Sequence, residues 1–77
     1  MTIRINTKYI EREMLCHYDD SHISRCYKKL AEDTKIQERT LMNNIRNKHF
    51  NIDVITEVAF VLKLDVKKVF VKEKNNE

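Results

Sequence analysis

The chain contains no glycine and no proline among its 77 residues, and this absence constrains its fold more than any other feature. Glycine adopts a left-handed backbone without a steric penalty, and proline pre-sets the backbone angle of many turns. Every turn must therefore be formed by Asn, Asp, Ser or Thr, or by a residue that bears some strain. The same absence excludes a glycine-rich loop that would cradle phosphate groups.

The length and composition predict one globular domain. We expect it to span residues 1–77, with terminal strands or tails at 1–6 and 71–77. Hydrophobic residues make up 42% of the chain, which is enough for a core. Neither a bilayer-spanning apolar run nor an apolar signal-peptide segment is present, so we expect a cytoplasmic protein without a membrane partner. A chain this short buries only about 60% of its unfolded surface, so pairing with another copy would add useful stability.

The positive charge is concentrated in the middle third of the chain. Residues 25–48 carry seven basic and three acidic side chains, a net charge of +4, whereas residues 49–77 are neutral and residues 1–24 net −1. A basic segment of this kind is typical of a surface that binds a polyanion such as nucleic acid. An ordinary solvated helix face can have the same composition, so both interpretations stand at this point.

Hydrophobic spacing predicts a mainly α fold of four to five short helices. We expect Thr7 to cap the first helix and residues 19–21 to separate it from the second. At the ends of the chain, Thr2–Asn6 alternates polar and apolar residues and Val69–Lys72 is β-branched and aromatic. These ends are either frayed or paired as a small two-stranded sheet. The expected helices are residues 7–18, 22–33, 37–47, 52–62 and 67–70.

The second and third helices have the spacing of a helix-turn-helix. Two helices cross tightly over a short turn only if a small residue lies where they touch, and Ala31 is in that place. Ile36 is expected to fill the corner between the helices, and Leu41 to pack beneath the second helix. Leu41 and Ile45 then face inward from the third helix.

From about Tyr27 to Phe70 the chain resembles the phage Cro and repressor family of helix-turn-helix domains, the xenobiotic-response-element type. The second half carries the resemblance separately. Asn51-Ile52-Asp53 leads into an apolar-Ala-x-x-Leu pattern at residues 58–62, and a short "apolar-apolar-Phe" segment ends at Phe70. The resemblance implies a DNA-binding regulator from a phage or mobile element.

The chain departs from this family where the family carries glycine. Lys35 occupies the turn position, and a left-handed lysine there would cost on the order of 1 kcal/mol. After the third helix, Asn47 is the residue best suited to a left-handed backbone. The inward pair Leu41 and Ile45 is spaced i, i+4, whereas the family more often has i, i+3, a position that Asn44 occupies here.

The outward side chains of the third helix are the candidate DNA contacts. Arginine can pair with guanine, asparagine with adenine, and glutamate can accept from cytosine. By resemblance, Glu38, Arg39 and Asn43 occupy the base-reading positions. Contacts with phosphate fix the position of a protein on the duplex without reading sequence. We assign base reading to Glu38, Arg39, Asn43, Met42 and Arg46, and backbone contacts to Gln37, Thr40, Lys48, His49, Lys28 and Lys29.

Cysteine and histidine provide a second, weaker hypothesis. His22 and Cys26 are four residues apart on one helix, and Cys16-His17 can approach from the first helix, which makes a four-ligand zinc site conceivable. The spacing matches no common zinc finger, so two thiols in or near the core are the alternative. The sequence shows no catalytic constellation, and we expect neither an enzyme, a metal site nor a cofactor.

Together these patterns predict a repressor-like transcriptional regulator that binds a short operator on double-stranded DNA, as a homodimer. The alternative is a protein-binding module on the same fold, such as an antirepressor or an inhibitor of a host enzyme. The acidic Glu38 at the front of the third helix suits that alternative. Salt dependence separates the two, because binding to DNA weakens steeply as salt rises.

Overall fold

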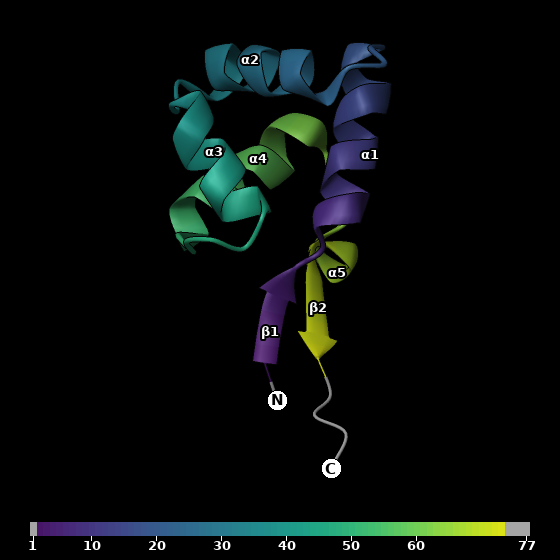
Figure 1. Ribbon diagram of the computed structural model, residues 1–77. Helices are drawn as coiled ribbons and strands as arrows, with labels where there is room; N and C mark the ends of the chain where they lie inside the picture. The colour runs from purple at the N-terminus through teal and green to yellow at the C-terminus, as the bar shows by residue number, and fades with distance from the viewer. Residues whose placement is uncertain (1, 74–77) are drawn as a thin grey trace.

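The computed structural model describes residues 2–73. In this range one strand precedes five helices and a second strand follows them, and the two strands pair as one small sheet (Figure 1). This arrangement confirms the predicted mainly α fold class, including the helix-turn-helix order of its second and third helices and the small terminal sheet. The elements are β1 (Thr2–Ile5), α1 (Thr7–Tyr18), α2 (Ile23–Thr34), α3 (Glu38–Ile45), α4 (Ile52–Leu62), α5 (Val66–Val69) and β2 (Phe70–Glu73).

The two strands join the ends of the described chain. β1 and β2 are antiparallel, with Ile5 opposite Phe70 and Ile3 opposite Lys72. The pairing continues past the strands, because the Asn6 backbone N–H donates to the Val69 carbonyl at 2.8 Å. In Figure 1 the two-stranded sheet extends from one end of the helical body. The sheet interpretation of the termini is therefore confirmed for residues 2–73, and the tail expected at the C-terminus lies partly outside the described residues.

The core is formed where the first four helices meet, and Ile5 and Val69 close it on the side of the sheet. Tyr27 is its largest fully buried side chain. The predicted inward pair of α3, Leu41 and Ile45, is fully buried, as expected from the i, i+4 spacing. The other buried apolar residues are Ile10, Met14, Cys26, Leu30, Val54, Ile55, Val58, Leu62 and Leu64.

The prediction that Thr7 caps the first helix is wrong. Asn6 is the N-cap, and its side-chain oxygen accepts from the Tyr9 backbone N–H at 3.3 Å. Thr7 is the first helical residue, and its hydroxyl donates instead to the Ile45 carbonyl at 2.6 Å. The threonine therefore satisfies a carbonyl at the end of α3, a long-range partner that local spacing cannot reveal.

Turns without glycine are made by residues with a left-handed backbone. Asn47 follows α3 with φ 64°, as predicted, and Lys35 ends α2 with φ 62°, which settles a backbone that the sequence left open. Asp19 and Lys63 adopt the same region after α1 and α4. Each of these residues has a Cβ atom, so each carries part of the strain that glycine would avoid.

The two cysteines occupy different environments, so the expectation of two thiols in or near the core holds for Cys26 and not for Cys16. Cys26 is buried, and burial raises the pKa of its thiol. Cys16 is exposed on α1. Among residues 2–73 no three His, Cys, Asp or Glu side chains are grouped so that they could hold a metal ion. No helix in this range is long and apolar enough to cross a bilayer.

Candidate nucleic-acid interface

α2, the turn at residues 35–37 and α3 form one continuous unit. The Lys35 backbone N–H donates to the Ala31 carbonyl at 2.9 Å, which closes the last turn of α2. Ala31 and Ile36 are both partly buried against the core. This agrees with the prediction that Ala31 is the small residue between the two helices and that Ile36 fills the corner. Figure 1 shows α3 descending from the end of α2 at a steep angle. α3 thus begins at the surface of the molecule and its inward face continues into the core.

The N-terminal half of α3 presents polar side chains to solvent. Gln37 and Arg39 are exposed, and Glu38 and Asn43 are half-buried on the same helix. In residues 2–73 no carboxylate lies within ion-pair distance of the Arg39 guanidinium. Arg39 and Asn43 are four residues apart, so they lie on the same helix face, within reach of one ligand.

Thr40 and Met42 are less accessible than the helical pattern suggested. Both are half-buried, and Met42 packs against the core. The Thr40 carbonyl accepts from the Asn44 side-chain amide at 2.8 Å. Of the two, Met42 is the one that contributes to packing between α3 and the core.

The structure holds Arg46 against α1. Its Nε donates to Glu11 Oε2 at 2.9 Å, and its guanidinium carbon lies 5.4 Å from the centre of the Tyr27 ring. The Tyr27 hydroxyl donates to the same Glu11 oxygen at 2.7 Å. Hydrogen bonding to Glu11 raises the pKa of Arg46, and burial followed by the bond to Glu11 raises that of Tyr27. Arg46 therefore links α1, α2 and the end of α3, and its guanidinium is engaged within the protein although the side chain stays partly exposed.

The basic residues expected to contact phosphates lie at the surface on two segments. Lys28 and Lys29 are exposed on α2, and Lys48 and His49 are exposed in the loop after α3. Lys29 is the one with a described acidic neighbour, since its Nζ lies 3.4 Å from Asp20 Oδ2. The backbone N–H groups of Lys48 and His49 both donate to the Asn43 carbonyl, which holds this loop against the end of α3.

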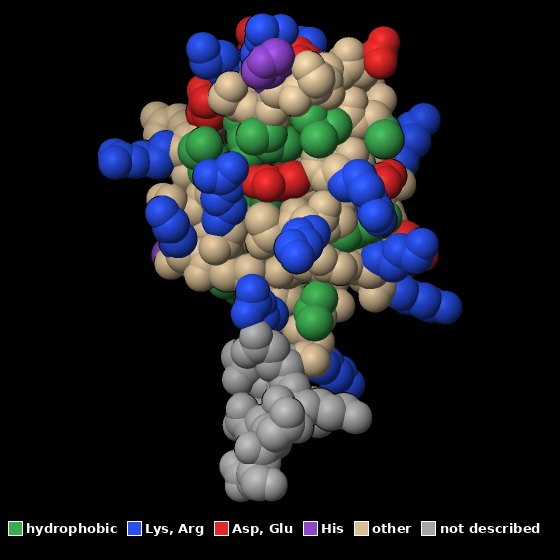
Figure 2. All heavy atoms as spheres, turned by 45° about the vertical axis from the view of Figure 1, so that its right-hand side comes forward, with side chains coloured by type: hydrophobic (Ala, Val, Ile, Leu, Met, Phe, Trp, Pro, Cys, Tyr) green, Lys and Arg blue, Asp and Glu red, His purple; other side chains and the backbone are tan. Residues whose placement is uncertain are grey.

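Basic side chains are not restricted to these two segments. Figure 2 shows Lys and Arg side chains spread over the side of the molecule on which α1 lies in Figure 1, with few Asp and Glu side chains among them. Basic side chains therefore also lie outside residues 25–48, although the rest of the chain carries no net positive charge. What distinguishes α3 is the combination of an exposed basic side chain, Arg39, and a half-buried amide, Asn43, on one helix face.

Two asparagines that the sequence analysis did not assign to the site connect α3 to the neighbouring elements by hydrogen bonds. Asn44 is buried, and its amide donates to the Thr40 carbonyl while its oxygen accepts from the Asn51 backbone N–H at 2.6 Å. It therefore joins α3 to the N-terminal end of α4. The signal for it was its place at the i+3 position from Leu41, where an apolar residue is more usual.

Asn47 is the second of these residues. Its side-chain oxygen accepts from the Ile5 backbone N–H at 2.7 Å, and its amide nitrogen donates to the Ile5 carbonyl at 2.9 Å. The same nitrogen lies 3.3 Å from the Thr7 hydroxyl. The end of α3 is thus bonded to β1, more than half the chain away. Sequence reasoning identified the left-handed backbone of Asn47 and missed these bonds, because nothing local shows that β1 passes beside it.

No protein-family model, no curated protein and no solved structure matches this chain.

Proposed function

We propose that this protein is a non-enzymatic, repressor-like regulator that acts in the cytoplasm and binds a short operator on double-stranded DNA through α3. The observation that carries the proposal is the pair formed by the exposed Arg39 and the half-buried Asn43, which share one face of α3 directly after a helix-turn-helix corner. In this geometry the first residues of the second helix of such a unit contact base edges in the major groove.

The chemistry of this face suits base reading. A guanidinium can donate two hydrogen bonds to guanine, and a side-chain amide can bond both ways with adenine. Glu38, half-buried beside them, can accept from the amino group of cytosine and would repel nearby phosphates. A negative charge at this point supports contact with bases more than contact with the backbone.

Lys28 on α2 and Lys48 after α3 lie on the segments that flank the reading face, and we assign them to phosphates, together with Gln37, Thr40, Lys29 and His49. Each neutralised phosphate releases counterions, so the logarithm of the affinity should fall linearly with the logarithm of salt concentration. A single helix of this kind contacts only a few base pairs. We therefore propose that two copies bind half-sites about one helical turn apart.

Selection of bound sequences from a random duplex pool tests this proposal. The wild-type protein is compared with the double variant Arg39→Ala, Asn43→Ala, and Arg12→Ala on exposed α1 serves as the matched arginine control. We expect a palindromic motif with wild type and with the control, and loss of that motif in the double variant while its circular dichroism spectrum stays unchanged. No enrichment by the wild-type protein at low salt would refute DNA binding.

A further inference from the structure

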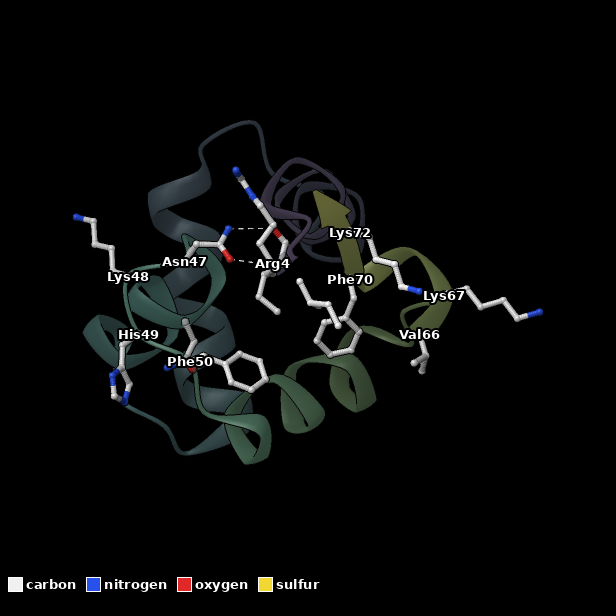
Figure 3. A pocket seen from close by; sticks show the side chains of 12 residues that line it. Arg4, Asn47, Lys48, His49, Phe50, Val66, Lys67, Phe70 and Lys72 are labelled. Atoms are coloured by element: carbon white, nitrogen blue, oxygen red, sulfur yellow. Dashed lines mark hydrogen bonds between the residues drawn. The ribbon is translucent and has the colours of Figure 1, made fainter. Parts of the chain in front are cut away.

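A groove of about 780 Å³ runs between the terminal sheet and the loop that follows α3 (Figure 3). Ile3, Phe70 and Lys72 line it from the sheet, and Val66 and Lys67 from α5. The opposite wall is formed by residues 47–50. The groove is separate from the N-terminal half of α3, since none of residues 37–43 lines it.

The floor of the groove is apolar and open to solvent. The rings of Phe50 and Phe70 lie edge to face with their centres 6.5 Å apart. Phe50 is 57% exposed and Ile3 is 61% exposed, although both are large apolar side chains. In Figure 3 the two rings point toward each other across the groove. A contiguous apolar patch of this kind is typical of a binding site, because leaving it in water is unfavourable.

The rim of the groove is basic. Lys48 and Lys67 extend outward at opposite ends in Figure 3, and Lys72 lies along one side. Among the described residues that line the groove there is no aspartate or glutamate. The potential over the apolar floor is therefore positive, which favours a partner that carries negative charge around an apolar centre.

The wall formed by the loop is held in place before any partner arrives. Asn47 is bonded to both backbone groups of Ile5, shown as dashed lines in Figure 3, and Asn44 is bonded to the Asn51 backbone. A site whose walls are already ordered loses less conformational entropy on binding than one that must be assembled.

We propose that this groove binds a short acidic segment of another protein, in which apolar side chains cover Phe50 and Phe70 and flanking Asp or Glu side chains pair with Lys48, Lys67 and Lys72. A second copy of this chain is a poor occupant, because two such grooves face to face would oppose like charges. Duplex DNA is also a poor occupant, since its phosphates would satisfy the lysines and leave the aromatic floor uncovered. Lys48 is shared with the proposed phosphate contacts, but Phe50, Lys67 and Lys72 are not, so this inference does not depend on DNA binding by α3.

Fluorescence anisotropy with short synthetic peptides tests the proposal. The probe set has pairs of Phe or Leu residues flanked by Asp and Glu, and the matched sets replace the acidic flanks by Lys or the apolar pair by Ala. The variants are Phe50→Ala and Lys67→Glu, neither of which belongs to the proposed DNA face. Phe60→Ala and Lys63→Glu on the exposed end of α4 and just after it are the matched controls.

We expect acidic peptides with apolar pairs to bind best, and Phe50→Ala and Lys67→Glu each to weaken binding about tenfold while the controls bind as wild type does. Preference for basic peptides, no binding by any peptide, or equal losses in the controls would overturn the proposal. Loss of duplex binding in Lys67→Glu or Phe50→Ala without peptide binding would assign the groove to nucleic acid. A dimer in sedimentation that Phe50→Ala dissociates would assign it to a second copy, and either result also overturns the proposal.

Discussion

The side-chain amide of Asn47 forms hydrogen bonds with both the N–H and the carbonyl of Ile5, at 2.7 and 2.9 Å. The amide therefore pairs with β1 much as the backbone of a neighbouring strand would. Because Asn47 lies just past the C-cap of α3, this residue joins the terminal sheet to the candidate DNA-reading helix. The left-handed backbone of Asn47, with φ 64°, is what brings the amide to this position.

Replacing Asn47 by alanine should lower the free energy of unfolding by about 2–3 kcal/mol. Two hydrogen bonds are worth about 1 kcal/mol each, and the alanine Cβ adds the cost of a left-handed backbone. Urea unfolding measures the loss, and hydrogen exchange at the Ile5 amide should become faster. Asn47→Gly is the control, because it removes the amide without the backbone strain and should lose less. Unchanged exchange at Ile5 in both variants would contradict the role of the amide.

Replacing Lys35 by glycine should raise the free energy of unfolding by about 0.5–1 kcal/mol. Lys35 has φ 62°, where a Cβ is unfavourable, and the relief exceeds the entropy that glycine loses on folding. The same substitution at Lys28, inside α2, should instead destabilise by about 1 kcal/mol. Thermal and urea unfolding compare the two variants. If both lysine-to-glycine changes destabilise equally, the turn at Lys35 is not strained.

Arg46→Ala should lower the stability of the protein, whereas Arg39→Ala should change the DNA motif that it selects. Arg46 is bonded to Glu11 and lies over the Tyr27 ring, so its loss should cost about 1 kcal/mol of stability, an amount reduced by the partial exposure of the pair. It should leave the selected DNA motif unchanged. Arg39→Ala should leave stability unchanged and alter the motif. A motif that changes in Arg46→Ala at full stability would place Arg46 among the base-reading residues.

Stability should fall at alkaline pH because of Tyr27. Burial and the bond to Glu11 raise the pKa of its phenol above the ordinary value of about 10, so the folded protein retains a proton that the unfolded chain releases. The contribution is complete below about pH 10 and is lost as the pH rises toward the folded pKa. The unfolding free energy of wild type should therefore fall more steeply above about pH 10 than that of Tyr27→Phe.

Tyr27→Phe should also cost about 1–2 kcal/mol at neutral pH, because the Glu11 carboxylate loses a donor. Tyr9→Phe is the matched control, because the Tyr9 hydroxyl accepts from the Asp65 backbone N–H and has no described bond to a carboxylate. Parallel curves for wild type and Tyr27→Phe across the alkaline range would show that the phenol does not contribute.

Much of the fold could be predicted from local patterns. The i, i+4 spacing of Leu41 and Ile45 identified the inward face of α3, since side chains four apart lie on one side of a helix. The absence of glycine pointed to Asn47 as a left-handed residue after α3, and it is one, whereas the left-handed backbone of Lys35 was left open by the sequence. These properties depend on residues close in the chain, so a sequence can specify them.

The contacts of the candidate site needed the tertiary structure. Arg46 follows the same spacing as Arg39 and Asn43, yet Glu11 from α1 lies within reach and holds it. Threonine is a residue type that often caps helices, but the Ile45 carbonyl lies close enough to accept a hydrogen bond from the Thr7 hydroxyl. The groove of Phe50 and Phe70 exists only because the ends of the chain meet beside the loop after α3. Side-chain hydrogen bonds act over about 3 Å, so partners far apart in sequence become known only once the fold brings them together.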